Sequence, residues 1–516
     1  MIKKLFCVLL IPVLLSFSVC FAGQKINKEY PYIQFLGAAQ SIGGSAILLD
    51  TGKTRFLIDY GLFYDKEDQQ KNLLVVDNPA KLKFVLLTHA HIDHSGRLPL
   101  LYKKGFKGQV VGTDATKDVT GRMLDMSLGI SETQGTKLFE RSDLNQMMER
   151  FATVEYGKIV SLSPDVEVRF NEAGHILGSS IIEIWIKQGK QKLKLVTSGD
   201  IGGNNIPILR DHAKITDADY VIIEATYGDR AKGPIDYKNF EKDISSTLNR
   251  GGSILIPAFV LEKTQKVIAI LCDMKRRGII PSHIPIYADS STAHDITSIY
   301  RSYTKYYDKE AKALIAKGQH PLSCDGLCEL SGKESITTHI NQKPAIYLCS
   351  SGMLEHAYSP KHLKAMISNP KNLLAIVGWQ APGTPGRKLQ EGAKTIEIPI
   401  ENWVNGKVVT ETFTMPVIMK VKKYDVFSSH ADGCEILGWL TDFKTIGQVF
   451  VVHGECNIAI GLAERITNNL GVPALAPAQN YIETLRFKKN KTSIKKTSGM
   501  CKGMNHNTSQ AGQADQ

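Results

Sequence analysis

The sequence contains no internal repeat of solenoid period and no collagen-like or low-complexity bias across its body. These absences argue against repeat and fibrous architectures. Hydrophobic residues make up 43% and charged residues 22% of the 516 residues, which is ordinary for a globular enzyme. A chain of this length exceeds what one hydrophobic core usually fills, so we expect two domains with terminal tails.

Cysteines are few and irregularly spaced. Two of the nine lie in the first segment, and the other seven form neither an even set nor a regular pattern, which argues against a disulfide framework. Cys324 and Cys328 form a lone CxxxC without a second half, so a structural zinc site is not expected. We expect free thiols, with a local disulfide between Cys324 and Cys328 as the alternative in an oxidising compartment.

The one long apolar run lies at the amino terminus. Two lysines precede the run Leu5 to Leu15, and the stretch Cys20 to Ala22 resembles a cleavage site with small residues. The run is shorter than the ~20 residues of a spanning helix and contains Pro12, which disfavours a membrane anchor. We therefore expect residues 1–22 to be a secretory signal and the mature protein to be periplasmic or secreted, with a lipid anchor at Cys20 as the weaker alternative.

Acidic residues are scarce at the carboxyl terminus. From Arg486 onward the chain has seven Lys or Arg residues and one acid, Asp515, so six of the net +12 charges (seven minus one) lie there. The same segment is rich in Ser, Thr, Asn and Gln, and we expect residues 488–516 to be a basic, disordered tail. Such a tail either attracts a polyanionic partner or is a plain solvated end, and the sequence leaves both interpretations open.

Short apolar runs in this sequence repeatedly lead to a residue that can do chemistry. The runs are 54–58, 84–87, 193–197, 220–223, 424–427 and 449–452, and they lead to Asp59, the segment 89–94, Asp200, Glu224, His430 and His453. In a layered fold such runs are strands buried on both faces, and the loops at their ends meet along one edge. The sequence therefore predicts a site where these loops converge.

The segment Thr88 to Gly96, THAHIDHSG, is the densest of these groups. His89 and His91 alternate along an extended loop, so both imidazoles can share one metal ion. Asp93 and His94 follow in the next turn of the chain and can reach a second ion. Imidazole and carboxylate ligands without a thiolate favour Zn²⁺, with Mn²⁺ or Fe²⁺ as less favoured ions.

THAHIDHSG resembles the HxHxDH signature of the metallo-β-lactamase superfamily. Further motifs of that superfamily follow in the expected order. Asp59 is similar to its first acidic motif, His175 in AGHILGSS to its third-motif histidine, and Asp200 in TSGDIG to its bridging aspartate.

Three later motifs narrow the resemblance to the β-CASP branch. Glu224 in EATYGDR, His430 in FSSHAD and His453 in VHGE are similar to the additional motifs of this branch, which contains the pre-mRNA 3′-end-processing endonuclease and bacterial and archaeal ribonucleases. The stretches PAFVLEKTQ, YADSSTAH, LCSSGML and VGWQAPGTPGR resemble its inserted domain. The resemblance extends from about Pro31 to Phe487.

The resemblance implies an α/β fold, namely a metallo-β-lactamase αββα sandwich with an inserted parallel α/β (β-CASP) domain. Residues 23–226 would form the first part of the sandwich, 227–400 the inserted domain and 401–487 the return segment. The sequence supports the insertion independently, because apolar strands alternate with helical segments such as Thr264 to Lys275. These strands are expected at 252–256, 284–287, 345–348 and 373–377.

The resemblance also implies a site with two Zn²⁺ ions, or Mn²⁺ in their place. The first ion would be bound by His89, His91, His175 and Asp200, and the second by Asp93, His94, Asp200 and His453. Two cations about 3.5–4 Å apart suit the in-line displacement at phosphorus.

The remaining motif residues would support the reaction. His430 is the expected general acid, with Glu224 orienting its ring and keeping it protonated. Asp59 would orient a metal ligand rather than act as an acid. The loops with Ser350, Ser351 and Gly352 and with Thr384 and Arg387 are candidates for binding phosphates, although such loops are also ordinary turns.

The function implied by the resemblance is zinc-dependent hydrolysis of RNA phosphodiester bonds, by internal cutting, by 5′-exonucleolytic cutting, or by both. Histidine at position 453 accompanies RNA-directed members of the family, which favours single-stranded RNA as the substrate. Two alternatives stay open: a secreted metallohydrolase acting on DNA, an acyl ester or a lactam, and a nucleic-acid-binding protein without catalysis. A homodimer is also left open.

Overall fold

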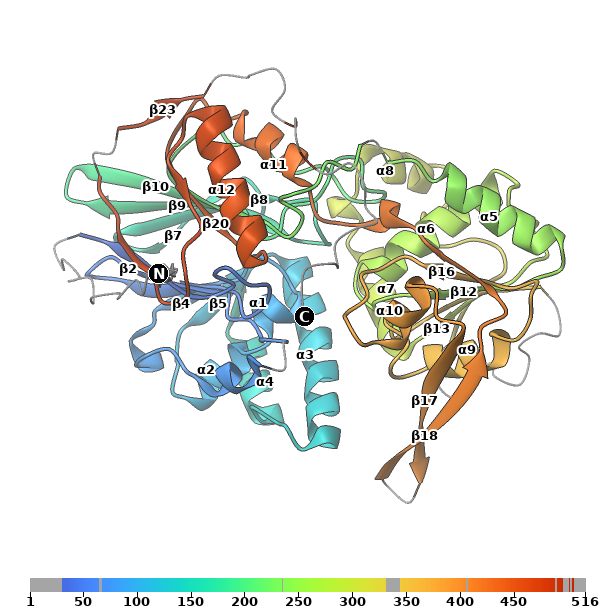
Figure 1. Ribbon diagram of the computed structural model, residues 1–516. Helices are drawn as coiled ribbons and strands as arrows, with labels where there is room; N and C mark the ends of the chain where they lie inside the picture. Colours follow the sequence, from blue (N-terminus) through green and yellow to red (C-terminus); the bar gives the residue numbers. More distant parts are fainter. Residues whose placement is uncertain are drawn as a thin grey trace, which may run out of the picture.

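The computed structural model describes residues 30–64, 67–233, 235–330, 344–404, 407–487, 490–494, 501 and 504. The expected signal at residues 1–22 lies outside them. Among the helices of the described part, none is long and apolar enough to cross a membrane. The described chain forms two lobes that are joined by several crossing segments (Figure 1).

The first lobe is built on two β-sheets that pack face to face (Figure 1, left). One sheet has the order β22 (Ile482–Thr484), β1 (Tyr32–Gly37), β2 (Ala46–Asp50), β3 (Arg55–Ile58), β4 (Phe84–Leu86), β5 (Gln109–Gly112) and β6 (Phe151–Thr153). The other has the order β21 (Ala474–Leu475), β20 (Thr445–Val452), β11 (Asp217–Glu224), β10 (Gln191–Thr197), β9 (Ser180–Gln188), β8 (Val166–Glu172) and β7 (Ile159–Ser163).

The apolar runs of the sequence explain why these strands are covered on both sides. In β11, Tyr220 and Ile222 belong to the core between the two sheets, whereas Val221 and Ile223 pack against the helices outside. Successive side chains of a strand point to opposite faces, so a continuous apolar run suits a strand in the middle of a layered fold.

Helices complete the outer layers of this lobe. Those over the first sheet are α1 (Ile92–Ser95), α2 (Leu98–Lys103), α3 (Asp114–Gln134) and α4 (Arg141–Glu149). Those over the second sheet are α11 (Gly433–Leu440) and α12 (Cys456–Leu470). The lobe is therefore an αββα sandwich, and the predicted fold class is confirmed.

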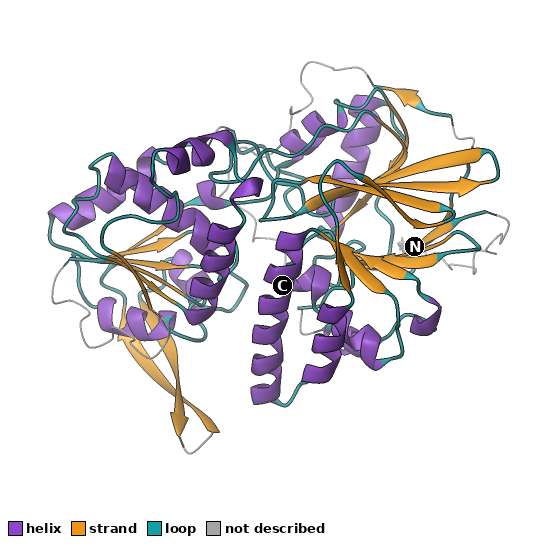
Figure 2. Ribbon diagram, turned by 180° about the vertical axis from the view of Figure 1, so that it is seen from behind, coloured by secondary structure: helices purple, strands orange, loops and turns teal. Residues whose placement is uncertain are grey.

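The second lobe is an inserted α/β domain. Within the described residues its main sheet has six strands, all parallel, in the order β14 (Leu327–Leu330), β13 (Ile286–Asp289), β15 (Ile346–Cys349), β12 (Ile254–Pro257), β16 (Leu373–Ile376) and β19 (Lys420–Lys423). Its helices are α5 (Lys238–Asn249), α6 (Lys263–Arg276), α7 (Ser291–Ser302), α8 (Lys309–Ala316), α9 (Ser359–Met366) and α10 (Pro385–Gln390). Figure 2 shows helices on both sides of this sheet and a hairpin, β17 (Thr395–Val404) and β18 (Lys407–Pro416), that projects from it.

The expected domain boundary at residue 400 lies too early in the chain. Residue 400 falls inside β17, and strand β19 at Lys420–Lys423 still pairs with β16 of the inserted sheet. The run 424–427, expected to be a strand, instead contains a 3-10 turn at Asp425–Phe427. The strand β19 precedes this run and is lysine-rich, with Lys420 and Lys422 paired to Asp243 at the sheet edge, so a search for apolar runs does not find it.

The expectation of free thiols is wrong for four cysteines. Cys272 pairs with Cys324 and Cys434 pairs with Cys501, each with a Cα–Cα distance of 5.3 Å. Cys328 is free, so the alternative of a local Cys324–Cys328 bond is also wrong. The partners lie 52 and 67 residues apart in the sequence and meet only through packing of the fold.

The carboxyl-terminal segment is also more ordered than its composition suggests. Strand β23 (Thr492–Ser493) pairs with β20, and the Lys491 ammonium lies 2.9 Å from the Asp219 carboxylate. Met504 is 4% exposed and joins the core around α11 and α12. The expected disorder is therefore wrong for residues 491–493, 501 and 504, because a few apolar and cysteine side chains among many lysines are enough to dock the segment.

We expect Cys501→Ser to lower the free energy of unfolding by about 2–4 kcal/mol, since the bond to Cys434 closes a loop of 67 residues. Urea titration of the oxidised protein measures this loss. Cys328→Ser is the matched control, because Cys328 is exposed and unbonded, and it should leave the free energy unchanged. Equal stability of Cys501→Ser and wild type would show that the bond does not contribute.

Candidate metal centre

The strands that carry the expected site residues run parallel within their sheets. β3 pairs in parallel with β4 in the first sheet, and β11 pairs in parallel with β10 and β20 in the second. Their carboxyl ends therefore present Asp59, the 89–94 segment, Asp200, Glu224 and His453 at one edge of the sandwich. The backbone turns sharply at two of these ends, where Asp59 and His453 have φ of 57° and 50°, a left-handed conformation that costs roughly 1–2 kcal/mol each.

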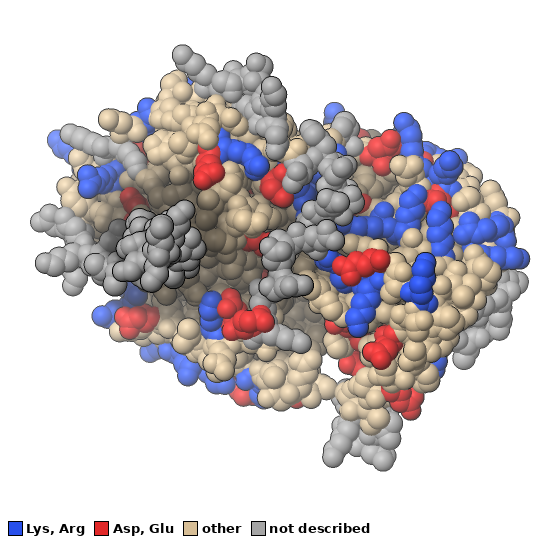
Figure 3. Space-filling model, in the orientation of Figure 1, with Lys and Arg blue, Asp and Glu red and all other residues tan. Residues whose placement is uncertain are grey.

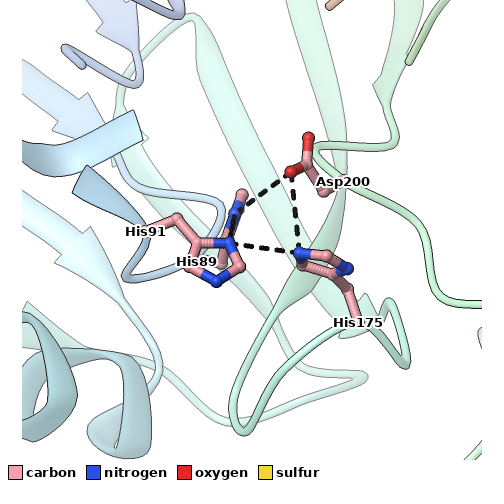
Figure 4. Close-up of side chains that lie close together, drawn as sticks. All are labelled: His89, His91, His175 and Asp200. Carbon is pink, nitrogen blue, oxygen red and sulfur yellow. Dashed lines mark hydrogen bonds and ion pairs between the residues drawn. The ribbon is translucent and has the colours of Figure 1, made fainter. Parts of the chain in front are cut away.

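The first cluster consists of His89, His91, His175 and Asp200, whose ligand atoms lie within 4.8 Å of one another (Figure 4). Asp200 Oδ2 lies 3.4 Å from His89 Nε2 and 3.6 Å from His175 Nε2. His91 Nδ1 lies 3.1 Å from His89 Nε2 and 3.2 Å from His175 Nε2. The four residues come from three different loops, and Figure 4 shows their polar atoms turned toward one point.

Close backbone packing brings the loop of Asp200 against the loop of His175. Gly202 donates its backbone N–H to the Ala173 carbonyl at 2.8 Å. A Cβ at position 202 would lie 2.0 Å from the Gly174 carbonyl oxygen, so only glycine fits. The short side chain at this point therefore lets the two loops approach closely enough for Asp200 and His175 to meet.

The second cluster consists of Asp93, His94 and His453. His453 Nε2 lies 3.2 Å from Asp93 Oδ2. Asp200 Oδ1 lies 3.3 Å from His94 Nε2 and 3.5 Å from His453 Nδ1, so the Asp200 carboxylate contacts one cluster with each oxygen. The geometry brings together all seven residues predicted as metal ligands and puts Asp200 between the two groups.

Burial gives the first cluster the protonation state that a metal requires. It lowers the pKa of His89 to about 3 and that of His91 to about 4, and it holds the pKa of His175 well below the ordinary value. These imidazoles are therefore neutral at neutral pH. Burial opposes ionisation of Asp200, but attraction from His453 and other neighbouring histidines outweighs it and holds the Asp200 pKa well below its usual range.

Asp59 lies behind the second cluster, as an orienting residue should. Its carboxylate accepts hydrogen bonds from the Thr88 backbone N–H and the Thr88 hydroxyl, both at 2.8 Å. It also lies 2.7 Å from His94 Nδ1, which turns His94 Nε2 toward Asp200. Burial opposes protonation of His94, but the Asp200 and Asp59 carboxylates raise its pKa well above the ordinary value.

Glu224 and His430 form a third group with Asp200. The Glu224 carboxylate accepts the Ile201 backbone N–H at 2.7 Å and lies 3.0 Å from His430 Nδ1. His430 Nδ1 is also 3.9 Å from Asp200 Oδ2, and the His430 side chain is 20% exposed. Because Nδ1 faces Glu224, the ring is oriented and Nε2 lies on its opposite side.

Two buried atoms indicate that these clusters suit a cation. Within the described residues, His94 Nε2 and Asp200 Oδ1, which face each other at 3.3 Å, are buried and make no hydrogen bond. Leaving such atoms unsatisfied costs about 1–3 kcal/mol each. The donor set contains only imidazole and carboxylate groups, which are the ligands that zinc and related ions bind. The residues present therefore fit the expected metal site.

The expected phosphate-binding loops have structural contacts of their own. The Ser351 hydroxyl accepts the backbone N–H groups of Glu355 and His356, both at 3.2 Å. The Thr384 hydroxyl caps α10 by accepting the Arg387 backbone N–H at 3.2 Å. Ser350 lies 3.1 Å from Ser290 through their hydroxyls, Gly352 packs closely on Phe259, and Arg387 pairs with Glu391 at 2.5 Å. Phosphate binding by these loops stays a prediction.

The sequence did not predict the role of three lysines around the loop of His430, of which Lys266 is buried and Lys232 and Lys263 are partly buried. Lys232 donates to the His430 carbonyl at 3.5 Å, Lys263 donates to the Phe427 carbonyl, and Lys266 donates to the Ser429 hydroxyl at 2.8 Å. Burial lowers the pKa of Lys232 and of Lys266 to about 8. A usable signal was present, since Lys266 shares one helical stripe with the apolar residues Ile270 and Met274.

Glu172, next to the His175 loop, should make stability depend on pH. Burial raises its pKa to about 7, although Arg210 lies 3.0 Å away. The folded state therefore holds the proton more tightly than the unfolded chain, so the stabilisation is present below about pH 4.5 and is lost as pH rises toward 7. Relative to that of Glu172→Gln, the free energy of unfolding of the wild type should fall by up to about 3 kcal/mol across this window.

Urea titrations of metal-free wild type and Glu172→Gln at several pH values measure that difference. Glu183→Gln is the matched control, because Glu183 is buried in the same sheet but is paired with Arg169 and Lys194, which lower its pKa against the effect of burial. The difference in free energy of unfolding between Glu183→Gln and wild type should stay constant above pH 5. If the corresponding difference for Glu172→Gln were also constant, the prediction would be wrong.

Three family models match successive parts of the chain. They are described as "Metallo-beta-lactamase superfamily" for residues 42–181, "Beta-Casp domain" for residues 264–389 and "Zn-dependent metallo-hydrolase RNA specificity domain" for residues 414–477. The first lies in the sandwich and the second in the inserted domain. The third spans the end of the hairpin, the His430 loop and β20.

Curated relatives and a solved structure agree with these matches. Ribonuclease TTHA0252 of Thermus thermophilus is 32% identical over 423 residues, covering 81% of this chain and 92% of that protein. Transcription termination factor FttA of Methanosarcina mazei is 30% identical over 483 residues, covering 90% of this chain and 74% of that protein. A crystal structure of a protein of unknown function from Enterococcus faecalis is 12% identical with a TM-score of 0.50, covering 88% and 100% of the chains, and shares the fold. This chain belongs to the β-CASP branch of the metallo-β-lactamase superfamily and is a metal-dependent hydrolase.

Proposed function

We propose that this protein hydrolyses phosphodiester bonds of single-stranded RNA with two zinc ions bound. The observation that carries the proposal is the Glu224–His430 pair beside Asp200, with His430 Nδ1 3.9 Å from Asp200 Oδ2. An alkoxide leaving group needs a proton, and an oriented imidazole next to the metal centre can supply it. The names of the relatives, one a ribonuclease and others transcription termination factors, support RNA as the substrate.

His89, His91, His175 and Asp200 would hold one ion, and Asp93, His94, Asp200 and His453 the other. When bound, the pair of ions would acidify water and neutralise charge on the phosphoryl oxygens. The chain itself contributes orientation and a proton. Asp59 fixes the ring of His94 through a 2.7 Å contact, and Glu224 fixes the ring of His430 so that its Nε2 can protonate the leaving oxygen.

The surface of the inserted domain is suited to a polyanion. Figure 3 shows Lys and Arg side chains forming a band across this domain on the face seen there. The whole chain carries a net charge of +12. Such a surface raises the local concentration of nucleic acid and makes binding depend on salt.

Cleavage of matched end-labelled and internally labelled single-stranded RNA and DNA by the zinc-loaded protein tests the proposal. We expect metal-dependent RNA fragments that disappear with a chelator and return when zinc is added. Fragment lengths would separate internal from end-directed cutting. Turnover of an ester or a lactam without RNA cleavage, in folded protein that holds zinc, would refute the proposal.

We also propose that the protein is exported after cleavage of residues 1–22. The two disulfides, Cys272–Cys324 and Cys434–Cys501, support this, because such bonds persist in oxidising compartments. Amino-terminal sequencing of protein recovered outside the cytoplasm should begin near Gly23. Recovery of the intact chain in the cytoplasm alone would refute export. The homodimer stays a prediction.

A further inference from the structure

A lysine of the inserted domain is buried against the loop that carries His430. Lys266 on α6 is 1% exposed, and a buried ammonium is costly unless it is paired and hydrogen-bonded. Its Nζ donates to the Ser429 hydroxyl at 2.8 Å and to the Ser428 carbonyl at 3.3 Å. Ser428 and Ser429 immediately precede His430, so Lys266 binds the backbone segment that leads to the proposed proton donor.

The same lysine is joined to a buried carboxylate at the start of α6. Glu262 Oε1 lies 3.9 Å from Lys266 Nζ, and Glu262 is 4% exposed. Glu262 has a positive φ of 62° with ψ of −52°, a strained conformation that residues with a side chain rarely adopt. This conformation turns the chain into α6 and lets Glu262 and Lys266 face each other across one helical turn.

The network continues to the loop of His175. The Tyr300 hydroxyl, on α7 and fully buried, donates to Glu262 Oε2 at 2.7 Å and accepts the Leu177 backbone N–H at 3.2 Å. Leu177 follows His175 by two residues. A continuous polar chain therefore runs from the His175 loop through Tyr300, Glu262 and Lys266 to the loop of His430.

The two loops that this hydrogen-bonded network connects also lie close to each other at the site. The rings of His175 and His430 have centroids 4.4 Å apart. His175 is a proposed metal ligand and His430 the proposed proton donor, so their separation sets the distance between metal and acid. Both loops belong to the sandwich lobe, whereas Glu262, Lys266 and Tyr300 belong to the inserted domain.

We propose that Glu262, Lys266 and Tyr300 are positioning residues of the hydrolytic reaction, which fix the loop of His430 relative to the loop of His175. The inference rests on the proposed role of His430 as the general acid. A misplacement of about 1 Å at a reacting group costs about 100-fold in rate. The correct spacing also requires the inserted domain to be docked as it is here, because that domain supplies the connecting side chains.

The test uses the zinc-loaded full chain with Glu262→Gln and Lys266→Met combined, so that no unpaired charge is left buried. Two phosphodiesters are compared, RNA and a substrate that releases p-nitrophenolate. A displaced His430 should lower kcat on RNA by about 100-fold, because an alkoxide needs the proton, with KM changed less than about twofold. The p-nitrophenolate substrate should lose less than about tenfold, since its leaving group departs without a proton.

Lys275→Met is the matched control, because Lys275 lies on the same helix and donates to the carbonyls of Ser282 at 3.0 Å and Asp325 at 2.6 Å. It should retain wild-type kcat on both substrates. Lys266→Arg, which keeps donors and charge, should recover much of the RNA activity. Equal losses on the two substrates, or an unchanged kcat on RNA in the folded double variant, would overturn the inference.

Hydrogen exchange gives a readout that does not depend on activity. In metal-free protein the double variant should exchange the backbone amides of residues 428–431 faster than wild type, and Lys275→Met should not. Unchanged exchange would overturn the inference. If wild type hydrolyses neither substrate, the proposed function fails, and the exchange result still decides whether Lys266 and Glu262 hold this loop.

Discussion

Replacing Asp200 with asparagine is expected to lower kcat/KM by roughly 10³-fold or more and to reduce the bound metal. One carboxylate faces both clusters, with Oδ2 3.4 Å from His89 Nε2 and Oδ1 3.3 Å from His94 Nε2. Asparagine keeps the size of the side chain but removes the charge that can neutralise two cations. Metal content measured on the folded protein, together with steady-state kinetics, checks the result.

Asp219→Asn is the matched control for this substitution. Asp219 is buried like Asp200, but it lies in β11 and outside the metal clusters. Its carboxylate accepts the Lys194 backbone N–H at 2.8 Å and pairs with Lys491. The control should keep wild-type metal content and activity even if its stability falls. If Asp200→Asn retained both the metal and the activity of wild type, a shared carboxylate ligand would be ruled out.

Replacing His430 with alanine is expected to lower RNA cleavage by about 10²–10⁴-fold while leaving the metal content unchanged. His430 contacts Asp200 only at 3.9 Å and is held by Glu224, so its removal deletes the proposed proton donor without deleting a proposed ligand. Glu224→Gln should have a smaller effect of about tenfold, because an amide oxygen can still accept from the ring while the charge is lost. Kinetics on RNA and metal analysis of the same preparations measure both effects.

His356→Ala serves as the control for His430→Ala. His356 lies in the inserted domain, where its exposed ring is 2.8 Å from the Glu401 carboxylate. RNA cleavage by this variant should match wild type. A parallel loss of zinc and activity in His430→Ala would contradict the acid role and would instead make His430 a metal ligand.

Local sequence determined much of the fold and most of the site. Strands such as β11 and β20 are continuous apolar runs, and a side chain that follows such a run is carried to the edge of the sheet. His89, His91, Asp93 and His94 lie so close in the sequence that no distant contact is needed to gather them. For these residues the spacing along the chain already sets the spacing in space.

Only the tertiary structure decided the features that depend on distant partners. The disulfide between Cys434 and Cys501 joins residues 67 apart, and it docks a segment whose composition suggested disorder. Strand β19 joined the inserted sheet through its pairing with β16, which moved the domain boundary.

The contacts of Lys266 also depend on residues that are distant in the sequence. A lysine is usually exposed to solvent. The positioning role proposed for Lys266 depends on its contact with Ser429, which lies 163 residues away in the sequence and 2.8 Å away in space. Apolar burial follows local periodicity and can be read from the sequence. A buried charge is stable only where the whole fold supplies its partners, so the helical stripe indicates that Lys266 is buried, but only the tertiary structure shows which groups it contacts.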